Sequence, residues 1–365
     1  MGLGSDCPFR IGRGRPGKRN LITDVSGVLV GHVTVDDGDY HSGVTALIPG
    51  PGNLFMEKLP AACHVINGFG KSLGLMQIEE LGTLESPVIL TNTFSVGTAA
   101  TALIQRAMTE NPEMGRNLPS LNPVVAECND GYLSDIRQMK IGREQVWEAL
   151  DRAAETFEEG ALGAGRGMSC LGYQGGIGSA SRQLELGGRT YTIGALSLCN
   201  FGRKGRLILG GERLGEKLLA YQETLSEAPT EQERQEADKG SIIMVLATDL
   251  PLSDRQLKRL CVRAGAGLAR TGSYYGHGSG DLALAFSTAR RIPQEKEPLL
   301  LTWQQLSEGC LEEALELSAE AVEESIISAL WQGESFAGRD GHQRPGFRQL
   351  YLSWRKTCDT IETVH

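Results

Sequence analysis

Several features that would mark a nucleic-acid-binding or membrane protein are missing from this sequence. Aromatic residues make up only 6% of its 365 residues, and 36 Lys and Arg are outnumbered by 45 Asp and Glu. With a net charge of −9 at pH 7, the chain offers no basic face for phosphates, which argues against a nucleic-acid partner. No apolar run approaches the roughly 18 residues of a membrane span, and the N-terminus does not join a basic region to an apolar one as a secretory leader does. We therefore expect a cytoplasmic protein without a membrane partner.

Metal and cofactor motifs are missing as well. The six histidines and eight cysteines include no Cys-x-x-Cys pair and no His-Glu-x-x-His motif, and several cysteines lie in apolar runs, as buried free thiols do. Two glycine-rich stretches match a phosphate loop only in part. Residues 67–72 end in Gly-Lys-Ser but have Val65 where the first glycine belongs, and residues 163–181 lack the Gly-Lys-Ser/Thr end. We expect turns between antiparallel strands at both stretches, and neither a metal nor a cofactor.

The remaining composition is that of a globular protein with one large domain or two, because 40% of its residues are hydrophobic and 22% charged. Residues 1–20, rich in Gly and Arg, are predicted to form an extended arm. The apolar pattern predicts two short strands within 21–34, joined at Gly27, and strands at 44–48, 88–91, 124–128, 191–199, 241–248 and 282–286. It predicts helices over 96–108, 143–159, 254–271 and 303–331. Strands surrounded by helices, with short strand-turn-strand connections, indicate an α+β layered sandwich.

The boundary near residue 240 is the most informative stretch of the chain. Residues 224–240 are polar and acidic without an apolar face, as in an exposed linker, and six apolar residues follow Ser241 without a break. Such a run is typical of a strand buried on both faces. A serine directly after Gly240 suits a nucleophile that frees its own α-amine by self-cleavage, because that amine has an ordinary pKa of about 7.7–8.0 and can serve as a base. A serine that merely begins a strand after a loop fits the same local pattern.

Further motifs follow one another along the chain. The most specific are Gly240-Ser241-Ile-Ile, Ala247-Thr248-Asp249, Gly267-Leu-Ala-Arg270-Thr-Gly272 and Gly276-His-Gly-Ser279-Gly-Asp281. With these motifs the sequence resembles, over nearly its whole length, the DmpA family of L-aminopeptidase/D-esterases and β-peptidyl aminopeptidases. The resemblance implies a single four-layer αββα domain over 1–365, like that of N-terminal nucleophile hydrolases but with different connectivity. It also implies self-cleavage into chains 1–240 and 241–365, and a homo-oligomer, namely a tetramer of processed αβ units.

The resemblance places the nucleophile at Ser241, and a second serine and an acid at Ser279 and Asp281. The 38 residues from Ser241 to Ser279 leave room for a strand, a helix and a return into an adjacent strand. A carboxylate two residues after a serine on a strand points to the same face, so Asp281 could orient Ser279 or the α-amine of Ser241. Taken alone, Ser279 and Asp281 also fit a glycine-flanked turn with a solvated acid.

Three further site residues come from the same resemblance. Asn200, at the end of a predicted strand, matches an asparagine that stabilises the oxyanion, and Tyr132 matches a tyrosine whose hydroxyl lies near that oxyanion. Glu127 matches an acid that could bind the free ammonium group of a substrate. Taken alone, Asn200 also fits a turn residue, and Glu127 a solvated carboxylate at a strand end.

Three positions depart from the pattern of the family. Lys71 stands where an acid commonly follows the Asn-Gly-x-Gly turn, and Phe69 occupies the variable position of that turn. Arg166 stands where a small hydroxyl residue is usual. If these side chains line the substrate pocket, an added cation and a bulky ring change the specificity rather than the reaction.

We predict an autoprocessed serine aminopeptidase or amidase that hydrolyses small peptides, amides or esters with a free N-terminal amine. Ser241 Oγ attacks the carbonyl while its α-amine takes the proton, and Asn200 with Tyr132 holds the oxyanion. Two alternatives stay open. One is acyl transfer of the ornithine acetyltransferase type, which uses a threonine as nucleophile. The other is a non-catalytic binding or scaffold protein that keeps the fold without cleaving itself.

Overall fold

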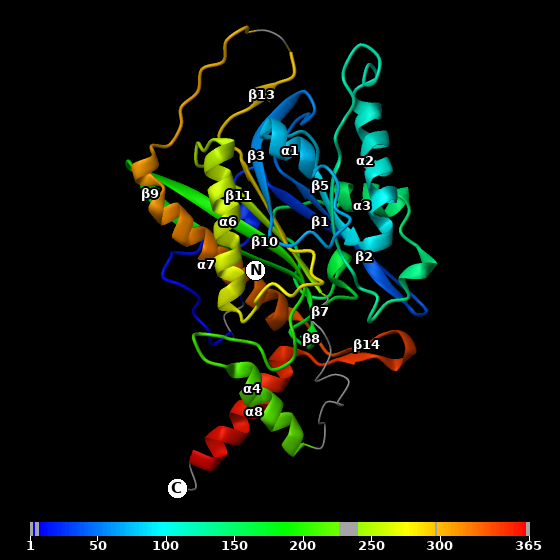
Figure 1. Ribbon diagram of the computed structural model, residues 1–365, viewed down its shortest axis with the longest axis vertical. Helices are drawn as coiled ribbons and strands as arrows, with labels where there is room; N and C mark the ends of the chain where they lie inside the picture. Colours follow the sequence, from blue (N-terminus) through cyan, green and yellow to red (C-terminus); the bar gives the residue numbers. More distant parts are fainter. Residues whose placement is uncertain (1–2, 4–6, 226–239, 296–297, 363–365) are drawn as a thin grey trace.

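Two stacked β-sheets form the centre of the structure, a computed structural model that describes residues 3, 7–225, 240–295 and 298–362 (Figure 1). The first sheet has the strand order β1–β2–β5–β6. Its strands are β1 (Leu29–Asp37), β2 (Tyr40–Ile48), β5 (Val88–Asn92) and β6 (Val124–Cys128). Strands β5 and β6 run parallel, whereas the other neighbours are antiparallel.

The second sheet has the strand order β13–β3–β12–β11–β10–β9, with β4 paired to β3. Its strands are β3 (Glu57–Val65), β4 (Thr83–Leu84), β9 (Gly176–Leu186), β10 (Arg189–Asn200), β11 (Ser241–Thr248), β12 (Leu282–Ser287) and β13 (Ile292–Pro293). Strands β11 and β12 are parallel, and the other pairs antiparallel. Strand β11 therefore lies inside the sheet, between one strand that precedes residue 240 and one that follows it.

Helices cover the outer face of each sheet. Helices α2 (Val96–Glu110) and α3 (Arg143–Asp151) pack on the first sheet through one apolar cluster. Helices α6 (Asp254–Arg270) and α7 (Glu312–Gln332) pack on the second sheet through another. A third cluster, to which Leu47 of β2 and Leu196 of β10 belong, lies between the sheets. The predicted α+β sandwich with four αββα layers is thus confirmed.

These layers explain the unbroken apolar run of β11. Ile242 and Met244 belong to the cluster beneath α6 and α7, whereas Ile243 and Val245 belong to the cluster between the sheets. All residues of β11 are buried, Ser241 included. Between the end residues Ser241 and Thr248, both faces of the strand lie in apolar cores, so its sequence there is continuously apolar rather than alternating.

The N-terminal arm is held by a buried ion cluster on α7. The guanidinium of Arg182, on β9, pairs with the carboxylates of Glu320 and Glu324, and these side chains are almost fully buried. The backbone N–H groups of Arg13 and Gly14 donate to the Glu320 carboxylate at 2.7 and 2.8 Å. The predicted arm therefore bridges α7 and β9, but its described residues are not extended throughout, because the chain bends at residues 12–14 and 18–20.

Smaller elements complete the described chain. They are α1 (Leu75–Leu81), α4 (Leu214–Thr224), α8 (Phe347–Glu362), the pair β7 (Ser169–Cys170) and β8 (Tyr173–Gln174), the pair β14 (Phe336–Ala337) and β15 (Gln343–Arg344), and the 3-10 turns Ile22–Asp24, Thr93–Ser95, Ile136–Gln138, Gly163–Gly165, Glu308–Cys310 and Arg339–Gly341. Helices α4 and α8 contact each other at the C-terminal end of the molecule (Figure 1). No helix in the described part of the chain is long and apolar enough to cross a membrane. None of the eight cysteines, which all lie in the described ranges, forms a disulfide.

Several sequence-based boundaries are wrong. The first half of 21–34 is a 3-10 turn rather than a strand, because the Asp24 carboxylate accepts the backbone N–H of Arg19 at 3.0 Å and bends the chain. Helix α3 ends at Asp151 instead of continuing to 159.

Helix α7 begins at Glu312 instead of 303, because the N–H of Leu306 donates to the Pro251 carbonyl at 2.8 Å and not to a helical partner. The stretch 163–181 forms a 3-10 turn, then the antiparallel pair β7 and β8 with Gly172 in the turn between them, and then the start of β9. A turn between antiparallel strands is thus present as predicted, but Gly176 and Gly178 lie within a strand. Most of the predicted linker 224–240 lies outside the described residues.

Candidate active site

Three strand ends meet at Ser241. This serine is the first residue of β11, and its partner in the antiparallel register is Asn200, the last residue of β10. Strand β12, parallel to β11, begins directly after Asp281. All three residues are buried, with only 5%, 6% and 1% of their surface exposed. The fold therefore brings Ser241, Asn200 and Asp281 to one edge of the second sheet.

The hydroxyl of Ser241 is held by a backbone donor. Its Oγ accepts the N–H of Gly280 at 3.1 Å. A Cβ atom on Gly280 would lie 3.1 Å from this Oγ and 2.9 Å from the carbonyl oxygen of Phe69, so a side chain there would press against the hydroxyl. From the first sheet, the thiol of Cys128 donates to the Ser241 carbonyl at 3.3 Å. Ser241 is thus fixed from both sheets.

The carboxylate of Asp281 receives three donors. The hydroxyl of Ser279 donates to Oδ1, the N–H of Ile242 donates to the same oxygen at 3.2 Å, and Nδ2 of Asn67 donates to Oδ2 at 3.2 Å. Ser279 is buried like Asp281. The alternative of a solvated acid in a glycine turn is therefore wrong. Asp281 is thus buried and bound to the backbone nitrogen of Ile242, the residue that follows Ser241.

The side chain of Asn200 is fixed at both ends of its amide. Its Oδ1 accepts the N–H of Ser169 at 2.8 Å, and its Nδ2 donates to the carbonyl of Asn129 at 2.9 Å. An amide nitrogen carries two hydrogens, so Nδ2 can donate a second hydrogen bond while it keeps this one. The orientation of the amide is set by β7 and by the turn after β6.

Tyr132 follows the turn whose Asn129 carbonyl binds Asn200. Its ring stacks on the ring of His342, with centroids 4.6 Å apart and planes 9° apart. The guanidinium carbon of Arg344 lies 3.7 Å from the Tyr132 centroid. The tyrosine is therefore held by residues 336–344, which we call the 336–344 hairpin and which contain β14 and β15.

Glu127 is the penultimate residue of β6, at the edge that holds Ser241. It is 2% exposed, its Oε1 accepts the N–H of Lys71 at 2.9 Å, and its Oε2 accepts the hydroxyl of Thr93. A Cβ atom on Gly70 would lie 3.4 Å from this Oε1 and 3.8 Å from the Cα of Gly280. The alternative of a solvated strand-end carboxylate is therefore wrong, and Glu127 lies close to the backbone that holds the Ser241 hydroxyl.

Asp130, in the turn after β6, is a second buried acid. It lies near the polar side chains of Tyr40, Ser42 and Asn92, and Nδ2 of Asn92 donates to the hydroxyls of Tyr40 and Ser42 at 3.1 and 3.0 Å. Burial raises the pKa of Asp130 to about 7, against the lowering influence of Ser42 and Asn92. This carboxyl therefore titrates near neutral pH.

Comparison with known proteins decides the family. The sequence model of peptidase family S58 matches residues 20–344, which include every site residue described above. The chain belongs to peptidase family S58.

Relatives of known structure or activity agree with this assignment. Beta-peptidyl aminopeptidase BapA of Sphingosinicella microcystinivorans is 36% identical over 345 residues, which cover 90% of this chain and 85% of BapA. A solved protein of Pyrococcus horikoshii OT3 is 46% identical, with a TM-score of 0.87 and coverage of 95% of this chain and 96% of that one. The L-aminopeptidase D-Ala-esterase/amidase of Ochrobactrum anthropi is 33% identical, with a TM-score of 0.86 and coverage of 95% and 96%.

The Ochrobactrum enzyme is a prototype of the serine aminopeptidases and has a variant of the Ntn hydrolase fold. The present S58 chain is accordingly a serine-type aminopeptidase or amidase with this fold variant. Of the three functions that the sequence left open, the hydrolase is the one that the comparisons support.

In this S58 peptidase the loop after β3 lies directly against the site. The N–H of Asn67 donates to the Asp281 carbonyl at 3.1 Å, and the N–H of Phe69 to the Ser279 carbonyl at 3.3 Å. Phe69 is 68% exposed, and the Nζ of Lys71 lies 5.1 Å from its ring centroid. Two of the three unusual residues therefore border the edge that holds Ser241.

Arg166, the third unusual residue, makes its contacts elsewhere. Its Nε lies 2.9 Å from both carboxylate oxygens of Asp36, and its guanidinium carbon lies 4.0 Å from the ring centroid of Phe336. The guanidinium of Arg166 thus pairs with Asp36 and lies over Phe336 of the 336–344 hairpin.

Sequence reasoning missed three groups of the S58 site. They are the side-chain amide of Asn67, the hydroxyl of Thr93 and the N–H of Gly280. Thr93 comes directly after β5, a predicted strand, and Asn67 comes two residues after β3, a strand that was not predicted; both strands end at the same edge as Ser241. The third is a backbone N–H, and the residue type does not show whether a backbone group faces a site.

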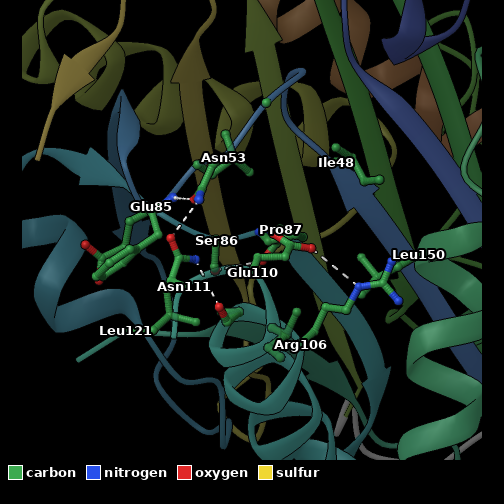
Figure 2. Close-up of a pocket in the computed structure, with 15 residues that line it drawn as sticks. Ile48, Asn53, Glu85, Ser86, Pro87, Arg106, Glu110, Asn111, Leu121 and Leu150 are labelled. Atoms are coloured by element: carbon green, nitrogen blue, oxygen red, sulfur yellow. Dashed lines mark hydrogen bonds and ion pairs between the residues drawn. The ribbon is translucent and has the colours of Figure 1, made fainter. Parts of the chain in front are cut away.

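A separate cavity lies at the other end of the first sheet (Figure 2). It has a volume of about 150 Å³ and is lined by residues at the start of β5 and the end of α2, among them Pro87, Arg106 and Asn111. Because Asn92, at the far end of β5, lies at the edge that holds Ser241, this cavity is remote from Ser241. Among the described residues, no group of three or more His, Cys, Asp or Glu side chains could hold a metal ion.

Proposed function

We propose that the protein breaks its own Gly240–Ser241 bond and yields chains 1–240 and 241–365. A Cβ atom on residue 240 would lie 2.0 Å from the Asn200 carbonyl oxygen, so the close approach to β10 requires glycine. Ser241 Oγ attacks the Gly240 carbonyl carbon, the C–N bond breaks, and the nitrogen takes up a proton to become the α-amine of Ser241. Water then hydrolyses the ester and leaves a carboxyl group on Gly240.

In the processed enzyme the α-amine of Ser241 is the base. It takes the Oγ proton as Oγ attacks the scissile carbonyl, and it returns the proton to the leaving amine before water releases the acyl group. The position of Asp281 supports this role, because its Oδ1 accepts the N–H of Ile242, the residue next to that amine. A carboxylate next to the amine stabilises the ammonium that forms during attack.

Asn200 and Tyr132 are the donors for the oxyanion. The amide of Asn200 is preorganised by its bonds to Ser169 and Asn129, and donors that need no reorientation contribute most to transition-state stabilisation. Tyr132 is held next to the same turn by the stack with His342.

The substrate proposal depends on one observation: the buried Glu127 carboxylate lies against Gly70, and Gly70 lies against Gly280, the residue whose N–H holds the Ser241 hydroxyl. A buried negative charge there favours a substrate with a free ammonium group and disfavours an acylated N-terminus. We propose small peptides, amides and esters with an unblocked N-terminal residue. The names of the relatives add β-amino acids as a candidate for that residue.

The decisive experiment compares the wild-type chain with Ser241→Ala by mass spectrometry and N-terminal sequencing. The wild type should give two chains, one of which begins at Ser241, without added protease. Ser241→Ala should stay as one chain of 365 residues and should not hydrolyse 4-nitroanilides of α- or β-amino acids. A wild-type chain that stays intact, or a cut at another residue, contradicts the proposal.

We further propose that processed units assemble into a homotetramer. Support comes from large apolar side chains that are exposed in the single chain, such as Met76 of α1 at 88% and Leu299 at 90%. Sedimentation equilibrium of the processed protein gives the number of units, and a monomer at micromolar concentration contradicts this proposal. Location in the cytoplasm stays a prediction from the sequence.

A further inference from the structure

The 336–344 hairpin contacts the backbone on both sides of Tyr132. Arg339 donates from Nε to the Gly131 carbonyl at 2.8 Å, and from its backbone N–H to the Leu133 carbonyl at 2.9 Å. The ring nitrogen Nδ1 of His342 lies 2.7 Å from the carbonyl oxygen of Tyr132. Three consecutive carbonyl groups of the first chain are therefore bound by one short segment of the second.

The hairpin is itself anchored on the first chain at its other end. The ring of Phe336 is contacted by the guanidinium of Arg166 at 4.0 Å and by the edge of the His41 ring at 5.0 Å. Arg166 is in turn fixed by the Asp36 carboxylate. This gives the unusual Arg166 a structural role: it holds the hairpin in place over the Tyr132 turn.

One residue of the hairpin contacts Tyr132 directly and is linked to Asn200 through Ser169. The guanidinium of Arg344 lies 3.7 Å from the ring centroid of Tyr132, and its Nε donates to the Ser169 hydroxyl at 3.2 Å. The N–H of the same Ser169 donates to the side-chain oxygen of Asn200. Arg344 is 7% exposed, so its guanidinium is locked in the interior and not a mobile surface group.

We infer that Arg344 is a positioning residue that holds Tyr132 and Asn200 in register for the oxyanion; this inference rests on the proposed roles of those two residues. A planar guanidinium can stack on a phenol ring with its face and donate a hydrogen bond from its edge, which an ammonium cannot do in one geometry. Oxyanion donors accelerate the reaction only when they are aimed before the charge develops, so loosening them lowers the turnover rather than substrate binding.

The test uses Arg344→Met, which keeps the length and apolar stem of the side chain, and Arg344→Lys, which keeps the charge but loses the planar edge. The matched control is Arg143→Met, because Arg143 also lies over an aromatic ring, that of Trp147 at 4.9 Å on α3. For each variant, kcat and KM for a free-amine 4-nitroanilide are normalised to the fraction of protein that has a Ser241 N-terminus.

Arg344→Met should lower kcat by roughly ten- to hundredfold, less than the loss of a whole donor, while KM changes by no more than about threefold. Arg344→Lys should fall between Met and wild type, and Arg143→Met should match wild type. In a double-mutant cycle, Arg344→Met should cost at least about tenfold less in the Tyr132→Phe background than in wild type.

Four results would overturn the inference. They are unchanged kcat in Arg344→Met, a rise in KM alone, an equal loss of kcat in both backgrounds, and full activity of both Tyr132→Phe and Asn200→Ala. Should Arg344→Met fail to fold, Arg344→Lys in the same cycle decides. None of these results touches the nucleophile, because that proposal is tested separately, by the self-cleavage of the wild type and by the loss of cleavage and hydrolysis in Ser241→Ala.

Discussion

Replacing Glu127 by glutamine tests how the enzyme recognises a free amine. The change removes a buried negative charge with almost no change in shape. The carboxylate already accepts the N–H of Lys71 and the hydroxyl of Thr93. A glutamine keeps a side-chain oxygen for Lys71, and the Thr93 hydroxyl can turn to accept from the new amide. No buried polar group loses its partner, so we expect Glu127→Gln to fold.

The expected magnitude follows from the bond that is lost. A charge-assisted hydrogen bond to a substrate ammonium in this buried position contributes about 1.5–3 kcal/mol, which is roughly ten- to hundredfold in binding. KM for free-amine substrates should therefore rise by this factor, while kcat falls less. Cleavage at Gly240–Ser241 should proceed, because the precursor has no free amine at that position.

The assay compares each amino acid 4-nitroanilide with its N-acetylated analogue, for wild type and Glu127→Gln. The ratio of kcat/KM between the two substrates should shrink in the variant. Glu85→Gln is the matched control: Glu85 is also buried, accepts the N–H of Asn122 at 2.8 Å and pairs with Lys58, but it lines the cavity at the far end of the first sheet. If Glu127→Gln leaves the ratio unchanged, the ammonium is bound elsewhere, and Asp130 is the next residue to replace.

Two further variants test other parts of the site. Asn200→Ala should lower kcat by roughly two to three decades in correctly folded protein, and near-normal kcat would remove Asn200 from the mechanism. Asp130→Asn should flatten the dependence of stability on pH. The folded chain binds the Asp130 proton more tightly than the unfolded chain, so its contribution is fully present below pH about 4 and is lost as the pH rises through about 7, by up to about 4 kcal/mol. The melting temperature of Asp130→Asn, compared with that of wild type, should therefore be higher at pH 8 than at pH 5. Plots of melting temperature against pH that run parallel for the two proteins would contradict this. Some slope will persist, because the pKa of the buried Glu159 is also raised to about 7, mainly by burial.

The parts of the fold that could be predicted from the sequence are those where one physical cause dominates. The run after Ser241 reads as a buried strand because apolar cores lie on both of its faces. The start of the helix 254–270 is indicated by Ser253, an N-cap residue whose Oγ accepts the N–H of Gln256. Helix α8 was not predicted.

The parts that could not be predicted depend on partners distant in the chain. The turn at Ile22–Asp24 looks like a strand because its apolar residues are buried, yet a single carboxylate bends it. Nothing near Arg166 in the sequence shows that its partners are Asp36 and Phe336. Likewise, Thr93 and Asn67 became site residues only once the strands before them were placed at the edge that holds Ser241.

The position of β11 inside the second sheet has a consequence for how long the enzyme lasts. A cut before Ser241 would leave β11 between β10 of one chain and β12 of its own, and the ion pairs of Arg182 with Glu320 and Glu324 would also join the two chains. Unfolding would then release two molecules in place of one, and refolding would require them to meet again, which becomes rarer as the protein is diluted. The single-chain precursor would unfold and refold reversibly, whereas the mature enzyme would persist mainly because its unfolding is slow.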